Sequence, residues 1–562
     1  MNHSRLRGLA TVLLLGLVGP NPAGAQDSTI APLRTLLATA QHRWARWPDF
    51  SRYGTELSRL YGSPPATLIW HYGSQLSRAG FAAIDELRAA GEHGLELTDY
   101  DAMLLDGLAR RSLRSPLTPA ARAQFDVLLS IDLLRYLDDL RRGRLHPNPL
   151  GPRGSDATTV DLAAAVSGVI RADSIAALVS AMEPQLVQYH SLRRALVRHR
   201  HLGADASFPP LPVGATVRPG DHYAGLAAIE QRLIAFGDLA AESIGKDSTD
   251  LYLGPVVAAL RQFQLRHGLA PDGVLGRGTF AELHTPLAWR VRQLELALER
   301  LRWLPPIEGK RILVVNIPAF ELFAFDSAGT SGSPALEMKV IVGRALDRRT
   351  PVLFEEMRYV EFWPYWNVPR SIVVGEILPE LHKRPGYLHA NEMELVGAHS
   401  AAAGDRVTPE ALDRLSRGEL GLRQRPGPAN PLGLIKFVFP NAADVYLHGT
   451  PFAELFTRTR RDFSHGCIRV EDPVALANWV LRDQPAWPPD GINAALRGLR
   501  TVRAPLARPL PVVVFYTTAV VRPDGTTWFY GDIYGQDRLL DEALRARAPL
   551  PVAPIAEAPL PD

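Results

Sequence analysis

The stretch Ser464-His465-Gly466-Cys467-Ile468-Arg469 contains the one cysteine of a chain of 562 residues and decides how its second half is interpreted. A thiol attacks as a thiolate, so a catalytic cysteine needs a base or a positive charge beside it. His448 precedes Cys467 by nineteen positions (467 − 448) and ends a strand expected over Val445-Tyr446-Leu447. If the segments before His448 and Cys467 end at the same edge of a sheet, the two side chains meet there.

The glycine and the helix next to the cysteine suit the same chemistry. Gly466 permits a tight turn, and such a turn can aim consecutive backbone N–H groups at one point, as an oxyanion hole requires. Asp472-Pro473 predicts the start of a helix whose N-terminal dipole would favour a thiolate at Cys467. On the residues alone, a structural cysteine flanked by histidines is an equal alternative.

Outward from this stretch, the periodicity of the apolar residues predicts a multidomain α+β chain. Helical spacing dominates residues 26–213, which we interpret as a helical scaffold domain, and a small helical unit follows over 219–285. From residue 311 the period changes to that of strands, so we expect a β-rich domain over 311–485.

Two further segments accompany the β-rich domain. Residues 376–430 are polar and rich in Gly and Pro, which predicts an insertion beside the site with the character of a lid. Val512–Tyr516 and Thr527–Tyr530 predict a hairpin joined through Pro523-Asp524-Gly525, as part of a C-terminal extension over 503–548.

The first 25 residues are typical of a secretory signal peptide. Arg5 and Arg7 precede the apolar run Leu9–Val18, and Ala23-Gly24-Ala25 supplies the small residues of a cleavage site. The run is too short for a comfortable membrane span. We therefore expect export to the periplasm, with an uncleaved inner-membrane anchor as the alternative.

Composition and motif content argue against several classes of protein. Lys and Arg total 62 against 59 for Asp and Glu, so the basic excess typical of nucleic-acid binders is absent from the sequence. The 16 histidines form no metal-ligand spacing, and no phosphate-binding loop occurs. We therefore expect no metal, no cofactor and no nucleic acid.

Several separated motifs between residues 311 and 482 resemble, in order, the L,D-transpeptidase catalytic domain (YkuD type) of the large Gram-negative kind. The motifs that carry the resemblance, besides His448 and Ser464–Arg469, are Val315-Asn316-Ile317-Pro318, Ile341-Val342-Gly343-Arg344, Thr350-Pro351, Trp366-Asn367-Val368-Pro369, Asn430-Pro431-Leu432-Gly433, Lys436-Phe437 and Pro440-Asn441.

The small unit at 219–285 resembles the peptidoglycan-binding type 1 domain, a three-helix fold. The residues that carry this resemblance are Leu260, Phe263-Gln264, Gly268-Leu269, Asp272-Gly273, Gly276 and Thr279. The helical region before it resembles the scaffold of the larger transpeptidases, more softly, through Gly91–Leu95 and Asp99-Tyr100.

The resemblance implies a mechanism of acyl transfer. Cys467 would attack the carbonyl between diaminopimelate and the terminal D-Ala of a tetrapeptide stem. His448, oriented by the backbone carbonyl of Gly449, would pair with the thiol and then protonate the leaving amine. The side-chain amine of a second stem's diaminopimelate would resolve the thioester into a cross-link between third residues. Stem peptides and glycan are the implied partners, and cell-wall synthesis proteins are candidate partners.

Further site residues follow from the same resemblance. Backbone N–H groups around Gly466 and Cys467 would hold the oxyanion, and His465 would either donate near it or support the loop. Gly449 and His465 stand where large Gram-negative members often carry aspartate and serine, which leaves the acceptor preference open.

Three side chains are expected to bind substrate: Tyr446, Ser464 and Arg469. Arg469 would bind a carboxylate of the acidic stem, with a loop-stabilising ion pair as its alternative. Tyr446 shares a strand face with His448 and would line the donor pocket, with core packing as its alternative.

The chemistry leaves three other functions open, and the resemblance adds one expectation. Water in place of the amine would make the protein an L,D-carboxypeptidase, and a protein acceptor would make it a lipoprotein-attaching transferase. A non-catalytic wall-binding protein is the third alternative. The resemblance also implies acylation of Cys467 by carbapenems.

Overall fold

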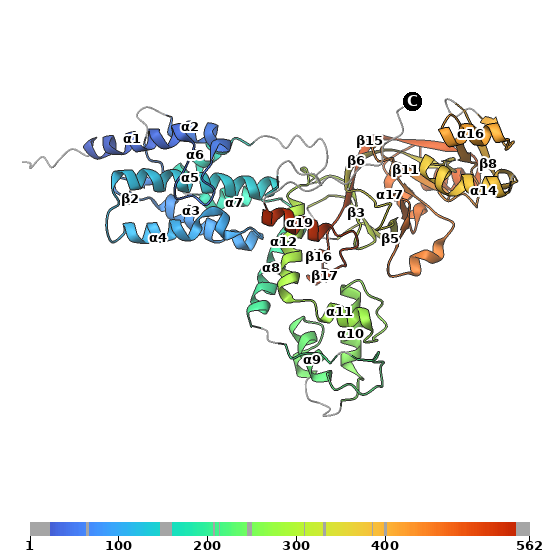
Figure 1. The fold of residues 1–562 in the computed structure, drawn as a ribbon, viewed down its shortest axis with the longest axis horizontal. Helices are drawn as coiled ribbons and strands as arrows, with labels where there is room; N and C mark the ends of the chain where they lie inside the picture. The colour runs from blue at the N-terminus through green and yellow to red at the C-terminus, as the bar shows by residue number, and fades with distance from the viewer. Residues whose placement is uncertain are drawn as a thin grey trace, which may run out of the picture. The chain divides into compact units, whose positions relative to one another are not determined.

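The computed structural model forms two compact units (Figure 1). Most of the expected signal peptide, residues 1–22, lies outside the described residues. Across the described ranges, no helix combines the length and the apolar character needed to cross a membrane. The described residues are 23–62, 67–145, 160–172, 174–205, 208–212, 214–243, 250–307, 309–329, 333–384, 386–397 and 402–546.

The first unit is formed by residues from 1–91, 96–138 and 159–182 and is helical, as the sequence predicts for the scaffold region. Its longest helix, α5 (Pro119–Arg142), begins where the Thr118 hydroxyl accepts a hydrogen bond from the Ala121 N–H at 3.2 Å and so caps the helix. The buried Asp126 carboxylate of α5 accepts hydrogen bonds from the backbone N–H groups of Ile69 and Trp70, both at 3.0 Å. The other main elements are α1 (Ala23–Thr39), α2 (Gly54–Tyr61), β1 (His71–Tyr72), β2 (Gln75–Leu76), α3 (Arg78–Arg88), α4 (Ala102–Ser112), α6 (Leu162–Ala172) and α7 (Ile175–Met182).

In the second unit, two long helices, α8 (Val187–Asp205) and α12 (Leu287–Leu301), share a hydrophobic core with a short hairpin. The hairpin is β16 (Ala519–Val521) paired with β17 (Thr527–Phe529). A buried ion pair of 2.5 Å between Arg300 and Asp537 joins α12 to the last described helix, α19 (Gln536–Ala546).

A separate core belongs to the small helical unit, which has the three helices that its sequence predicts. They are α9 (Leu226–Ala235), α10 (Pro255–Arg266) and α11 (Arg277–Leu283). The buried Gln264 amide donates to Asp272 Oδ1 at 2.9 Å and to Thr279 Oγ1 at 3.1 Å, and it accepts from the Gly273 N–H at 2.8 Å. The motif residues of this unit therefore support one another, as structural residues do.

A nine-stranded sheet with the order β13-β5-β14-β12-β11-β6-β15-β3-β4 forms the β-rich domain, and β4 also pairs with β5, which closes the sheet on itself. Helices α17 (Pro473–Leu481) and α18 (Pro489–Arg497) contribute to its core. The strands are β3 (Ile312–Asn316), β4 (Glu321–Phe325), β5 (Leu336–Gly343), β6 (Leu353–Phe362), β11 (Ile435–Val438), β12 (Leu447–His448), β13 (Asp462–Ser464), β14 (Ile468–Val470) and β15 (Val502–Phe515).

The hairpin expected from Val512–Tyr516 and Thr527–Tyr530 is wrong in its first strand. β15 lies inside the sheet, antiparallel to β6 and parallel to β3, and residues 519–521 take its place in the hairpin. The physical reason is burial: the consecutive residues Val512, Val513 and Val514 are all buried, so both faces of the strand are covered, and such a strand belongs inside a sheet.

The expected insertion folds around its own small hydrophobic core. Its four-stranded sheet begins at Trp366, ten residues before the expected start (376 − 366), and ends at Gln424. The elements are β7 (Trp366–Asn367), α13 (Arg370–Ile372), the π-helical turn η5 (Val373–Ile377), α14 (Leu378–Lys383), α15 (Tyr387–Ala390), β8 (Met393–Val396), β9 (Ala402–Gly404), α16 (Pro409–Arg417) and β10 (Gly421–Gln424).

Candidate active site

Parallel pairing of β12 with β14 brings the segments of the expected base and nucleophile side by side. Leu447 pairs with Ile468 and His448 with Arg469, and the Ile468 N–H donates to the Tyr446 carbonyl at 3.1 Å. Cys467 immediately precedes β14, and Tyr446 immediately precedes β12. The two residues therefore lie across from each other, just before the paired strands begin. His448 and Cys467 are nineteen positions apart in the sequence, but strand pairing brings their backbone segments next to each other.

The His448 imidazole is almost fully buried, with 3% of its surface exposed. Its Nδ1 donates to the Gly449 carbonyl at 2.6 Å, the contact that the sequence analysis expects for the orienting group. That bond leaves Nε2 as the proton acceptor of the neutral ring. Burial, with Arg469 as the next cause, lowers the pKa of His448 to about 3, so the ring is neutral at pH 7.

Cys467 is half-buried, and its thiol donates to the Asp444 carbonyl at 3.8 Å. Burial raises the pKa of the thiol to about 11, and the Tyr446 N–H, which favours the thiolate, does not offset it. Asp472 caps α17 by accepting from the Ala475 N–H at 2.8 Å, as its position before Pro473 predicts. Base and nucleophile are therefore both neutral in the resting protein.

Hydrogen bonds hold the backbone of the cysteine turn in place. Gly466 has φ +121°, a conformation that favours glycine, and its N–H donates to Ser464 Oγ at 3.1 Å. The Ser464 hydroxyl donates to the Cys467 carbonyl at 2.5 Å, and Thr350 Oγ1 donates to the Gly466 carbonyl at 2.7 Å. The Gly466 N–H is thus occupied, whereas the Cys467 N–H has no acceptor within the part of the chain that the structure describes.

His465 contacts the insertion. Its Nε2 lies 2.7 Å from Glu376 Oε1, and Arg348 Nη1 lies 3.1 Å from the same oxygen. Of the two roles left open for His465, this contact favours the loop-supporting one. Sequence reasoning missed Glu376 and Thr350 as neighbours of the turn, because both come from distant segments.

Tyr446 is buried with its ring centroid 5.7 Å from that of His448, and its pKa is raised well above the usual value, first by burial and then by Cys467. No carboxylate lies within 4.0 Å of the Arg469 guanidinium among the described residues, so the ion pair that was its alternative is not formed there. Lys436 of β11 lies across from His448. The sequence motif includes Lys436 but does not predict that it lies beside the base.

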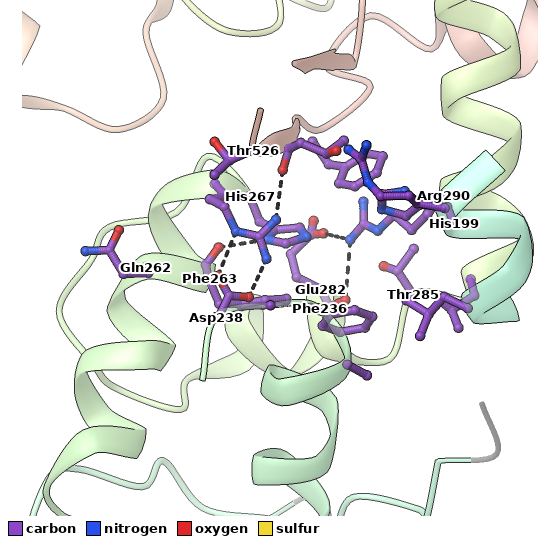
Figure 2. A pocket seen from close by; sticks show the side chains of 18 of the residues that line it. His199, Phe236, Asp238, Gln262, Phe263, His267, Glu282, Thr285, Arg290 and Thr526 are labelled. Carbon is purple, nitrogen blue, oxygen red and sulfur yellow. Dashed lines mark hydrogen bonds and ion pairs between the residues drawn. The ribbon is translucent and has the colours of Figure 1, made fainter. Parts of the chain in front are cut away.

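A cavity of about 510 Å³ lies away from the cysteine, between α8, α10, α12 and the β16–β17 hairpin (Figure 2). Two of its arginines are paired with carboxylates: Arg266 with Asp238, through an Nε–Oδ1 contact of 2.7 Å, and Arg290 with Glu282. His267 stacks between Phe263 and Phe529, and burial lowers its pKa well below the usual value. These groups satisfy one another, which suits a packed junction.

Across the described residues, no three His, Cys, Asp or Glu side chains gather in a way that could hold a metal ion.

Comparison with known proteins identifies three parts of the chain. Residues 310–514 match the model of the L,D-transpeptidase catalytic domain, residues 55–196 that of the "Scaffold domain", and residues 223–283 that of the "Putative peptidoglycan binding domain". The chain contains a YkuD-type catalytic domain and a peptidoglycan-binding domain.

Two individual proteins are similar to parts of the chain. A "Putative L,D-transpeptidase" from Haemophilus influenzae is 32% identical over 255 residues, which are 45% of this chain and 49% of that protein, so the chain spans about half the length of this curated relative. A crystal structure of the L,D-transpeptidase (residues 123–326) from Xylanimonas cellulosilytica is 16% identical, with a TM-score of 0.17, over 54% of this chain and 100% of that one.

Proposed function

Because residues 310–514 form an L,D-transpeptidase catalytic domain, we propose that this protein is a periplasmic L,D-transpeptidase that cross-links peptidoglycan. The observation that carries the proposal is the pairing of β12 with β14, which sets the oriented His448 and the Cys467 turn on neighbouring strand segments. The peptidoglycan-binding domain would hold the glycan near the site.

The first half of the reaction forms an acyl-enzyme. As Cys467 Sγ attacks the carbonyl that links diaminopimelate to D-Ala, Nε2 of the neutral His448 takes the thiol proton. The carbonyl oxygen becomes an oxyanion, for which the unoccupied Cys467 N–H is a donor. His448 then gives its proton to the amine of D-Ala, the C–N bond breaks, and a thioester between the stem and Cys467 results.

The second half returns the enzyme to its starting state. The side-chain amine of a second stem's diaminopimelate attacks the thioester, His448 accepts a proton from that amine, and the thiolate leaves as it regains a proton. The product is an amide between the third residues of two stems. Water as the acceptor gives a tripeptide instead, which is the L,D-carboxypeptidase alternative.

Product analysis tests the proposal. The protein from Gln26 onward is incubated with purified disaccharide-tetrapeptide, beside a Cys467→Ala control, and the muropeptides are separated and weighed. A cross-linked dimer that has lost one D-Ala, absent from the control, supports the transpeptidase. A tripeptide monomer alone supports the carboxypeptidase, and identical traces for both proteins contradict cysteine catalysis.

Carbapenem sensitivity is a separate part of the proposal. A strained β-lactam carbonyl would acylate the same thiol and add the whole inhibitor mass to the protein. Intact-mass measurement after prolonged incubation tests this, and an unmodified wild-type protein would contradict it.

A further inference from the structure

A row of charged and titratable side chains crosses one face of the catalytic sheet. In register, Arg503 of β15 pairs with Glu361 of β6, Glu361 with Lys436 of β11, Lys436 with His448 of β12, and His448 with Arg469 of β14. Residues that pair across neighbouring strands project to the same face. The row therefore presents three cations, one carboxylate and the catalytic imidazole to the same space.

This face is also the face of the cysteine. Cys467 lies two positions before Arg469, and side chains two apart along extended backbone share a face. Ile435 and Phe437, the neighbours of Lys436 on β11, are fully buried in the core on the opposite face. Lys436 thus projects toward the substrate side of the sheet.

Only one cation of the row is neutralised. Arg503 Nε donates to Glu361 Oε1 at 2.9 Å. Neither Lys436 Nζ nor the Arg469 guanidinium has a carboxylate within 4.0 Å in the described ranges, and the buried Arg469 Nε has no hydrogen-bond partner there. Two half-buried positive charges therefore flank His448 without an ion pair in the described ranges, although Glu361 and Asp444 act on Lys436 from a greater distance, and an anion would complete the arrangement.

The ammonium of Lys436 lies against the ring of Tyr446. Nζ lies 3.8 Å from the centroid of the Tyr446 ring, and Tyr446 lies across from Cys467. The acidic side chains that face Lys436 are Glu361 and Asp444, and neither forms an ion pair with it among the described residues; burial raises the pKa of the Asp444 carboxyl. A cation held against an aromatic face beside the reacting thiol is placed to meet a charge on the substrate.

We propose that Lys436, together with Arg469, forms a two-point receptor for the carboxylates of the donor stem, and that Lys436 is a specificity-determining residue. This inference rests on the proposed function. The donor offers two carboxylates close to the bond that breaks: the terminal carboxylate of D-Ala and the free carboxylate of diaminopimelate. The chemistry is the same for both, and the substrates below distinguish them.

The test compares three donor stems with three proteins. The stems are the disaccharide-tetrapeptide, the same compound with its D-Ala carboxylate amidated, and the same compound with its diaminopimelate carboxylate amidated. The proteins are wild type, Lys436→Met, which keeps the length and removes the charge, and Arg503→Met as the matched control. Arg503→Met removes a cation from the same row, but one that Glu361 already neutralises.

We expect wild type to lose at least about tenfold in kcat/KM on one amidated stem, because a charge-assisted hydrogen bond is lost. Lys436→Met should lose about the same factor on the unmodified stem, mostly through KM, and should no longer distinguish that amidated stem from its parent. Arg503→Met should keep the wild-type discrimination, and Lys436→Arg should restore most of it. Circular dichroism and the melting temperature confirm that each variant is folded.

Equal losses on all three stems for Lys436→Met would overturn the proposal, because the lysine would then act on the fold or the thiol and not on a carboxylate. Calorimetric binding of the same stems in the Cys467→Ala background, with and without Lys436→Met, keeps the receptor testable without turnover. If the stems bind with discrimination but the wild type does not turn them over, the proposed function is contradicted and the receptor stands. Binding that does not discriminate between the stems would overturn the receptor itself.

Discussion

The face of the catalytic sheet that carries His448, Lys436 and Arg469, here called the catalytic face, and the cavity beside the small helical unit both contain arginines and histidines. They differ in whether the positive charges form ion pairs. In the cavity, Arg266 and Arg290 each have a carboxylate within contact. On the catalytic face, Lys436 and Arg469 have none within 4.0 Å among the described residues. Charges that are paired with each other stabilise a packed junction, whereas charges without an ion pair beside a nucleophile are suited to bind a charged ligand.

The largest effect should come from removing the base of the catalytic face. His448→Ala should slow acylation of Cys467 by about 10²–10⁴-fold, because a buried, oriented imidazole supplies the proton transfer. Rapid-quench intact-mass kinetics measure the rate. His465→Ala is the control, expected to change it little, and equal losses for both histidines would contradict the assignment of the base.

The cavity should respond in stability rather than in rate. Asp238→Ala leaves the Arg266 guanidinium largely buried without its partner, which should cost about 3–5 kcal/mol of unfolding free energy. Urea denaturation measures the loss, with the Lys436→Met variant as the comparison. If Lys436→Met destabilised the protein as much as Asp238→Ala does, the contrast between the two regions would fail.

The pH dependence should follow from two neutral partners in the resting site. With the pKa of His448 at about 3 and that of Cys467 at about 11, both reactive forms are present from about pH 6 to pH 9, so acylation should be flat there. A limb near pH 7 in the rate profile would instead indicate a thiolate–imidazolium pair.

Stability should show the same plateau, with the signs set by linkage. Below about pH 6.5, His448 is protonated in the unfolded chain but stays neutral in the folded protein, so stability falls as pH falls toward 3. Above about pH 9 the unfolded chain loses the Cys467 proton first, so stability falls as pH rises toward 11. Melting temperatures across this range, with Cys467→Ser as the control for the alkaline limb, check both directions.

The smallest effect should come from the contact between the insertion and the cysteine turn. Glu376→Gln weakens the pairs with His465 and Arg348, which are partly exposed and worth about 0–1 kcal/mol. We expect at most about a fivefold change in acylation rate, and a loss as large as that of His448→Ala would show that the contact is part of the catalytic machinery.

Sequence alone predicted the elements whose signals are local. The helix start at Asp472-Pro473 and the Gln264 motif of the small unit both depend on residues that are close together in the sequence. The prediction of the hairpin after residue 503 was wrong because β15 is strongly apolar and pairs with β6 and β3, which are far away in sequence.

The same distinction holds for the candidate site. Gly449 as the orienting group was implied by the family resemblance, and the structure has that contact. Lys436, Thr350 and Glu376 reach the site only through strand register and tertiary folding, which no local pattern encodes. The hydrogen bond of the Gly466 N–H likewise depends on the orientation of the Ser464 side chain, which the sequence does not show.

The most direct measurement is the mass of the covalent intermediate. Wild-type protein and Cys467→Ala are mixed with disaccharide-tetrapeptide, quenched within one turnover, weighed intact and then mapped by peptide. We predict an adduct equal to the stem minus D-Ala, located on the peptide that contains Cys467 and absent from the variant. Release of D-Ala without such an adduct, or an adduct on another residue, would contradict catalysis through Cys467.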